Sequence, residues 1–178
     1  FMGHGRALAD IEIAERHEMM NLVGRANHDV GKSGWSNDTL DQLCAKLADC
    51  GKVHITTERE LPEHLGRFSY RGATNQIHHL MAFSDLYVGE SATMAHEAAF
   101  LGTAAIYDGA DHPGTTRELA AAGLVTALRQ EGADTLLDAV DTALSQNADA
   151  SVHRLDRYLA NKPNLSTYVV DALDRHAA

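Results

Sequence analysis

The clearest chemistry in this chain lies in a turn built from small and hydroxyl-bearing residues. The turn consists of Gly89, Glu90, Ser91, Ala92 and Thr93. It ends an apolar run expected to form a buried strand, Asp85–Gly89, and opens a helical segment, Ala92–Leu101. Backbone N–H groups and the positive end of a helix dipole meet at such a junction, which therefore suits a phosphate group. Ser91 could equally be a plain helix cap, although that would explain this serine alone.

A carboxylate, Glu97, lies on the second turn of the same helix, within the otherwise apolar sequence MAHEAAFLG. A charge in such surroundings needs a partner. Ribose hydroxyls beside a bound diphosphate would provide one, and a nearby arginine or backbone N–H would provide another. Spacing alone supports both interpretations equally. The turn and this carboxylate together indicate a site for a nucleotide or a nucleotide sugar.

A second loop, residues 25–35, carries ionisable side chains just after the first expected strand. His28 and Asp29 are its candidate catalytic residues. A histidine pKa near ~6.5 suits proton transfer at neutral pH, and the same side chain could bind a diphosphate. A solvent-exposed loop histidine is the plainer alternative.

Two other patterns in the chain are weaker. Gly31–Ser33 resembles the end of a phosphate-binding P-loop, but Ala26 stands where that motif requires a glycine. The 11 histidines and two cysteines show no His-Glu-x-x-His and no Cys-x-x-Cys spacing, so we expect no metal site.

A third loop, residues 111–118, joins a strand to a helix at the same edge of the expected sheet. Arg117 could reach a phosphate group there. Thr115 and Thr116 open the helix and are candidate ligand-binding residues with Arg117, although a capping role is the simpler interpretation of the two threonines.

Apolar spacing along the chain predicts alternating strands and helices. The expected strands are 19–24, 52–57, 68–70, 85–89, 103–107 and 124–128. The expected helices are 36–49, 58–67, 75–83, 92–101, 114–122, 133–144 and 151–176, the last in two pieces. Such alternation predicts an α/β fold, a doubly wound parallel sheet in a Rossmann-like, three-layer α/β/α arrangement. We expect residues 19–178 to form one domain and residues 1–18 to be a linker or a remnant of an upstream segment.

The expected strand order brings the two most unusual loops together. In the six-stranded order 3-2-1-4-5-6, strands 19–24 and 85–89 are neighbours at the point where the order reverses. Ligands bind beyond the carboxyl ends of such strands, so the loops that carry His28 and Ser91 should face one crevice.

Composition excludes several classes of function. The net charge of −10 argues against a nucleic-acid partner. We expect no membrane span, because no apolar run approaches the ~20 residues that one requires. We expect no secretory leader and a reduced, cytoplasmic setting, since Cys44 and Cys50 are poorly spaced for a disulfide. The excess of acidic residues and the scarcity of lysine resemble the composition of halophilic proteins, and an ordinary acidic surface is the alternative.

Three segments carry a resemblance to known families. Glu90–Ala98 resembles the Asp-Ser-Gly-Gly-x-Gln-Glu-Glu-Ala segment of UDP-N-acetylglucosamine 2-epimerases. Leu101–Ile106 resembles the Leu-Gly-x-Pro-x-x run of GT-B glycosyltransferases, and Thr115–Glu118 resembles the epimerases' Thr-Thr-Glu-Arg. The chain is most similar to an archaeal GT-B-like family of unknown function linked to polysaccharide biosynthesis. That family carries a His-Asp-Val-Gly-x-Ser-Gly loop, as at His28–Gly34, and a Gly-Glu-x-x-Thr-Met-x-x-Glu-Ala-Ala run, as at Gly89–Ala99.

The resemblance implies roles for individual residues. Ser91, with the amides of Ala92 and Thr93, would hold the diphosphate, and Glu97 would hold the ribose. His28 stands where the epimerases place a histidine implicated in catalysis. Ala92 and Thr93 replace the Gly-Gly pair and narrow the approach to the phosphate, and Ala104 replaces the usual proline. Asp29 replaces an arginine and puts a negative charge beside an anionic ligand.

The resemblance also implies that this chain corresponds to the second half of a GT-B protein. GT-B enzymes have two Rossmann-like domains with the active site between them, so an N-terminal Rossmann-like domain would be a missing partner. We therefore expect a UDP-sugar as substrate, no cofactor, and binding without turnover by this chain alone. A homodimer is a further expectation. The alternatives are a non-catalytic nucleotide-binding or regulatory module and, more distantly, a P-loop-like nucleotide hydrolase.

Overall fold

A five-stranded parallel sheet forms the centre of the molecule, in the order β2-β1-β3-β4-β5. The computed structural model describes residues 19–25, 34–57, 60–146, 149–160 and 162–177. The strands are β1 (Met19–Arg25), β2 (Gly51–Thr57), β3 (Leu86–Gly89), β4 (Ala104–Asp108) and β5 (Val125–Leu128). The helices are α1 (Asn37–Cys50), α2 (Ile77–Phe83), α3 (Ala92–Phe100), α4 (Gly114–Ala121), α5 (Ala133–Leu144), α6 (Asp149–Leu159) and α7 (Leu165–Ala177). Two 3₁₀ helices, η1 (Glu63–Phe68) and η2 (Thr74–Gln76), precede α2.

The prediction that the first strand lies beside the strand before the Gly89–Thr93 turn is confirmed. β1 pairs in parallel with β3, and Gly24 lies opposite Gly89 at the carboxyl ends of the two strands. The chain that leaves β1 and the turn that leaves β3 therefore start side by side at the switch point of the sheet. His28 and Asp29 lie outside the described residues.

The prediction of a third strand at Phe68–Tyr70 is wrong, because these residues do not form a full strand. The segment makes one isolated parallel bridge, in which Ser69 lies opposite Ile55 of β2. Its first residue, Phe68, ends η1, because Glu63–Phe68 winds into a 3₁₀ helix before the chain reaches the sheet. The sheet thus has five strands instead of six, and β2 is an edge strand.

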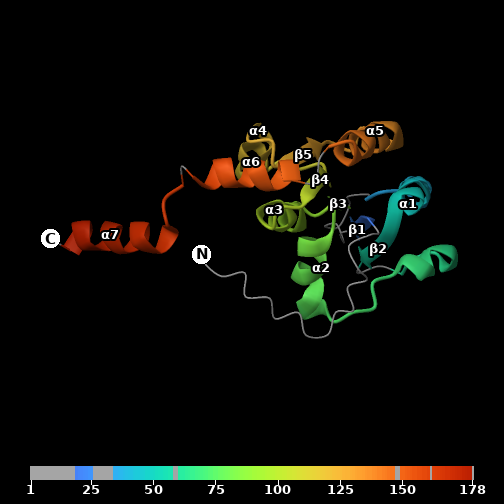
Figure 1. Cartoon of the computed structure of the whole chain (residues 1–178), viewed down its shortest axis with the longest axis horizontal. Helices are drawn as coiled ribbons and strands as arrows, with labels where there is room; N and C mark the ends of the chain where they lie inside the picture. The colour runs from blue at the N-terminus through green and yellow to red at the C-terminus, as the bar shows by residue number, and fades with distance from the viewer. Residues whose placement is uncertain (1–18, 26–33, 58–59, 147–148, 161, 178) are drawn as a thin grey trace.

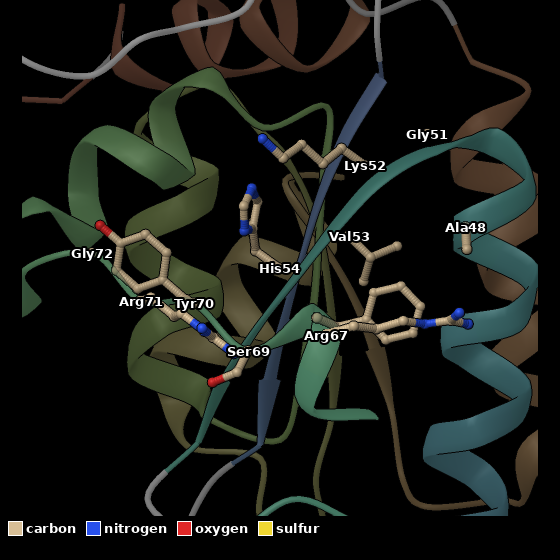
Figure 2. Close-up of a pocket in the computed structure, with 11 residues that line it drawn as sticks. Ala48, Gly51, Lys52, Val53, His54, Arg67, Ser69, Tyr70, Arg71 and Gly72 are labelled. Atoms are coloured by element: carbon tan, nitrogen blue, oxygen red, sulfur yellow. The ribbon is translucent and has the colours of Figure 1, made fainter. Parts of the chain in front are cut away.

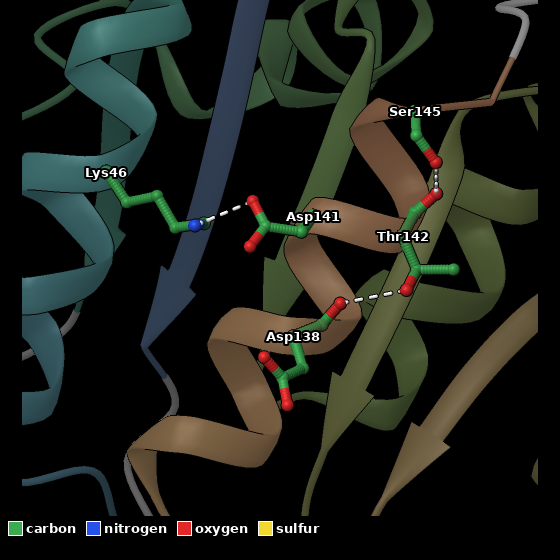
Figure 3. Close-up of polar contacts among 5 residues, drawn as sticks. All are labelled: Lys46, Asp138, Asp141, Thr142 and Ser145. Atoms are coloured by element: carbon green, nitrogen blue, oxygen red, sulfur yellow. Dashed lines mark hydrogen bonds and ion pairs between the residues drawn. The ribbon is translucent and has the colours of Figure 1, made fainter.

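Two apolar clusters make the molecule three layers thick (Figure 1). On one face of the sheet, α1 and α5 pack on Val53, Ile55, Leu86, Val88 and Ile106. An ion pair of 2.6 Å between Lys46 of α1 and Asp141 of α5 joins these two helices (Figure 3). On the other face, α2, α3, α4 and α6 pack on Tyr87, Ala105, Tyr107 and Val125. Consecutive residues of β3 and β4 point to opposite clusters, as the pleat of a strand requires. Both faces of the central strands are covered, which is why their sequences are apolar throughout.

The last helix, α7, stands apart from the three layers (Figure 1). Its apolar residues follow helical spacing and point into solvent: Leu165, Tyr168, Val169, Val170 and Leu173. Each of these side chains is at least 46% exposed, and Leu165 reaches 73%. None of the helices in the described part of the chain has the length and apolar content needed to cross a bilayer.

We predict that core and α7 leucines differ sharply in their effect on stability. Leu43 of α1 is 0% exposed in the first cluster, so Leu43→Ala removes buried methyl groups and leaves a cavity. The expected loss is about 2–5 kcal/mol in the free energy of unfolding, measured by urea denaturation. Leu165→Ala in α7 is the control and should change that free energy by less than about 0.5 kcal/mol. Equal losses in the two variants would contradict this assignment of the core.

Candidate functional site

The turn between β3 and α3 presents a capped helix N-terminus at the carboxyl edge of the sheet. Ser91 is the N-cap residue, and its hydroxyl oxygen accepts a hydrogen bond from the Met94 backbone N–H at 3.3 Å. The N–H groups of the first helical residues, Ala92 and Thr93, precede the regular ladder of the helix and have no partner within it. Ser91 and Ala92 are half-buried and Thr93 is exposed. These groups can therefore meet a ligand from the solvent side.

Glu90 faces inward from the same turn. Its side chain is only 3% exposed, and Oε1 accepts a hydrogen bond from the backbone N–H of Trp35 at 2.6 Å. Trp35 lies just before Ser36, the N-cap of α1, so this bond ties the start of α1 to the end of β3. Glu90 thus makes a structural contact, where the sequence suggested a ligand contact.

Asp108, at the end of β4, completes the floor of the site. Its Oδ2 accepts the indole N–H of Trp35 at 2.8 Å, and its Oδ1 accepts the backbone N–H of Gln130 at 2.6 Å. Asp108 and Trp35 are 3% and 6% exposed. Through these two carboxylates the ends of β3 and β4, the start of α1 and the loop after β5 become one hydrogen-bonded unit.

Glu97 projects from the second turn of α3, and its side chain is 40% exposed. Its Oε2 lies 3.2 Å from Nε2 of His78, which belongs to α2. The partner of this carboxylate is therefore an imidazole, and not the arginine or backbone N–H considered as structural alternatives. The Glu97 side chain remains open to solvent beside the contact.

His96, the neighbour of Glu97, points toward α4. Its Nε2 lies 2.8 Å from the hydroxyl of Thr116, which is fully buried. Burial lowers the pKa of His96 below its ordinary value, and the negative charge of Glu97 partly opposes this shift. The lowered pKa favours the neutral imidazole, and its contact with Thr116 joins α3 to α4.

The loop before α4 differs from the sequence expectation. The helix begins at Gly114, and its N-cap residue, Pro113, has no side-chain capping bond, so neither Thr115 nor Thr116 caps the helix. Thr116 is instead buried against His96, whereas Thr115 is exposed. Arg117 is exposed, and its guanidinium donates to the carbonyl of His112. This contact stabilises the loop before α4. The sequence had predicted instead that Arg117 reaches toward a phosphate.

The structure therefore gathers some of the candidate residues at one edge of the sheet and adds others. Ser91, Ala92 and Thr93 lie together at the start of α3, and Glu97 follows one turn along. No group of three or more histidine, cysteine or carboxylate side chains suited to a metal ion occurs within the described ranges. The sequence analysis missed Trp35 and Asp108. The sequence signal that could have identified Asp108 was its position as a polar residue at the end of the apolar strand Ala104–Asp108.

The fold is GT-B-like and is similar to about half of each of two glycosyltransferase structures. The glycotransferase of kitacinnamycin superposes with a TM-score of 0.64 over 98% of this chain and 47% of its own, at 14% sequence identity. Spinosyn rhamnosyltransferase SpnG gives 0.59 over 90% of this chain and 46% of its own, at 17% identity. The chain spans about half the length of these structures. Protein-family models and curated protein sequences give no match.

We predict that Trp35→Phe destabilises the molecule through the lost indole N–H. Phenylalanine keeps an apolar ring in the cluster but leaves the buried Oδ2 of Asp108 without this donor. The expected loss is about 1–3 kcal/mol in the free energy of unfolding, followed by circular dichroism in urea. The double variant Trp35→Phe/Asp108→Asn should lose less than the sum of the two single variants, because the two side chains interact. Strict additivity would show that the bond contributes nothing to stability.

Proposed function

We propose that this chain is the nucleotide-sugar-binding half of a GT-B type glycosyltransferase, or of a related UDP-N-acetylglucosamine 2-epimerase-like enzyme. The likeness to two glycosyltransferases concerns the fold alone, so the proposal rests on the site. The observation that carries it is the parallel pairing of β1 and β3, with Gly24 opposite Gly89. It brings the start of α3 to the switch point, where open α/β sheets bind their ligands.

Ser91 can cap α3 and bind a phosphate at the same time. A hydroxyl group has one donor and two acceptor positions. The bond from the Met94 N–H uses an acceptor position, which leaves the O–H free to donate to a phosphate oxygen. The amides of Ala92 and Thr93 and the helix dipole add to this attraction. The structural role of Ser91 as a cap is therefore compatible with diphosphate binding.

Glu97 is the proposed acceptor for the ribose hydroxyls. It lies on the same helix as the phosphate-binding amides and retains an exposed fraction of 40%. A carboxylate has about four lone-pair positions, so the contact with His78 leaves capacity for two hydroxyl donors. His78 would then hold the carboxylate in place. His28 and Asp29 stay candidates for acid–base chemistry, because the chain that carries them leaves β1 at the same edge.

A second domain would form the other wall of the crevice and supply further catalytic groups. This chain matches less than half of each glycosyltransferase structure. The exposed apolar residues of α7 offer a surface for such a partner, since patches of this kind are usually covered in the functional assembly. We therefore propose that the chain binds a nucleotide sugar without turning it over.

A non-catalytic nucleotide-binding or regulatory module is the second candidate, and Glu90 is the observation that favours it. This carboxylate immediately precedes Ser91 and is almost completely buried. A negative charge beside a phosphate site opposes binding, more strongly where water is excluded. Weak binding without chemistry is the expected property of such a module.

We predict measurable binding of UDP and UDP-N-acetylglucosamine by isothermal titration, with Glu97 contributing to it. Glu97→Ala should weaken binding by about 1–3 kcal/mol, because it removes a charged acceptor of hydrogen bonds. The matched control is Glu63→Ala, at an exposed carboxylate in η1, which should leave the affinity unchanged. Absence of heat at millimolar ligand, with a folded sample, would refute the proposal. Equal effects of the two variants would remove Glu97 from the site.

We also predict that Glu90→Gln strengthens the binding of UDP. The amide oxygen of glutamine can still accept the Trp35 N–H, while the negative charge beside the phosphate site disappears. A gain of several-fold in affinity is expected at low ionic strength, and salt should reduce the difference between the variant and the original protein. An unchanged or lower affinity, with unchanged stability, would place the diphosphate away from the start of α3.

A further inference from the structure

A hollow lies on the outer edge of β2, away from the carboxyl ends of the strands. Its volume is about 640 Å³ (Figure 2). It follows the first half of β2 and the segment after η1. The lining residues are Ala48, Gly51, Lys52, Val53, His54, Arg67, Phe68, Ser69, Tyr70, Arg71 and Gly72. We call this hollow the β2 groove.

The β2 groove is positively charged in a protein that is strongly acidic. Three of its lining residues are cations, Lys52, Arg67 and Arg71, and none is a carboxylate. The whole chain, by contrast, has 25 acidic and 15 basic side chains. None of the three cations forms an ion pair with another residue in the described part of the chain. Their charge is therefore available to an anionic ligand.

Aromatic rings lie among these cations. The guanidinium of Arg67 lies 4.6 Å from the centre of the Phe68 ring. His54 and Tyr70 meet edge to face, with ring centres 6.0 Å apart. Burial lowers the pKa of His54, and the charge of Lys52 lowers it further. The groove thus combines apolar contact surface with cations that form no ion pair among the described residues.

The backbone of β2 is also able to accept another strand here. The Tyr70 N–H already donates to the Ile55 carbonyl at 2.9 Å, in the isolated bridge with Ser69. Backbone polar groups alternate in direction along a strand, so the N–H and C=O of Val53 point to the same side as those of Ile55. β2 is the last strand of the sheet on this side, and no described strand lies beside Val53. An extended segment could continue the ladder from the point where Ser69 leaves it.

The cations flank this free edge on both faces of β2. Figure 2 shows Lys52, His54, Tyr70 and Arg71 on one side of the strand, with Val53 and Arg67 on the other. An added strand would also alternate its side chains between the two faces. Carboxylates on it would meet Lys52 and Arg71 on one face and Arg67 on the other, and apolar side chains would contact Val53 and Phe68.

We propose that the β2 groove binds an extended, acidic segment of a partner protein, which adds a strand to the edge of the sheet. Main-chain hydrogen bonds supply the attachment and the flanking cations supply the selectivity for carboxylates. This interaction surface is separate from the proposed nucleotide-sugar site. It does not depend on that site being occupied.

The test is a titration of the isotope-labelled 178-residue chain, followed by amide NMR. The probe is an acetylated six-residue peptide of alternating glutamate and valine. We expect saturable shifts confined to Gly51–Ile55 and Phe68–Gly72. A peptide of alternating lysine and valine should give none. The double variant Lys52→Ala/Arg71→Ala should weaken binding at least tenfold, whereas Arg129→Ala, at an exposed cation of the loop after β5, should not change it.

Four outcomes would overturn the proposal. Absence of shifts with the acidic peptide would mean that the cations only protect an edge strand from self-association, a common use of edge lysines. Shifts with inorganic phosphate or tripolyphosphate, but not with the peptide, would make the groove a small-anion site. Sedimentation could show a dimer that forms with increasing protein concentration and is weaker in Lys52→Ala/Arg71→Ala. The edge of β2 would then bind a second copy of the chain. Equal binding by the wild-type chain and by a folded Lys52→Ala/Arg71→Ala variant would exclude the cations from any role.

Discussion

The hydrogen bonds of Trp35 hold the candidate site together. Its backbone N–H donates to Glu90 and its indole N–H donates to Asp108, and all three residues are almost completely buried. A buried carboxylate without a donor is costly, so each of these contacts depends on the others being in place. The tryptophan thereby fixes the distance between the start of α1 and the turn that begins α3. Any ligand at the switch point lies above this unit.

The same carboxylates impose a constraint on function. Glu90 and Asp108 stabilise the loops that form the site, and their charges oppose an anion bound above them. The start of α3 provides the opposing attraction through its N–H groups and dipole. In the proposed function, the affinity for a diphosphate would be the balance of these two effects. This balance would decide between the two proposed functions, a substrate-binding half of an enzyme and a weak nucleotide-binding module.

Local patterns in the sequence predicted most of the fold, because strand and helix periodicity reflect burial on one face. Ala133–Leu144 was expected as a helix and is α5, and the parallel pairing of β1 with β3 followed from the alternation of elements. The segment 68–70 was expected as a short strand. It pairs at a single position, since η1 uses the preceding residues.

The contacts of the site were less predictable, because they join residues far apart in the chain. Trp35 is separated from Glu90 by 55 positions and from Asp108 by 73. No local pattern records such a partner. Glu90 was therefore assigned to the ligand on the strength of its place in the turn, and Thr116 to a helix cap. The three-dimensional packing gives both of them partners within the protein.

Trp35 is also the only tryptophan of the chain. Its indole ring is buried at the carboxyl edge of the sheet, bonded to a carboxylate at the end of β4. The tryptophan fluorescence of the protein therefore originates at one known point, directly beneath the proposed nucleotide-sugar site. The molecule carries its own optical reporter of that site, and tyrosine emission from elsewhere can be excluded by the choice of excitation wavelength.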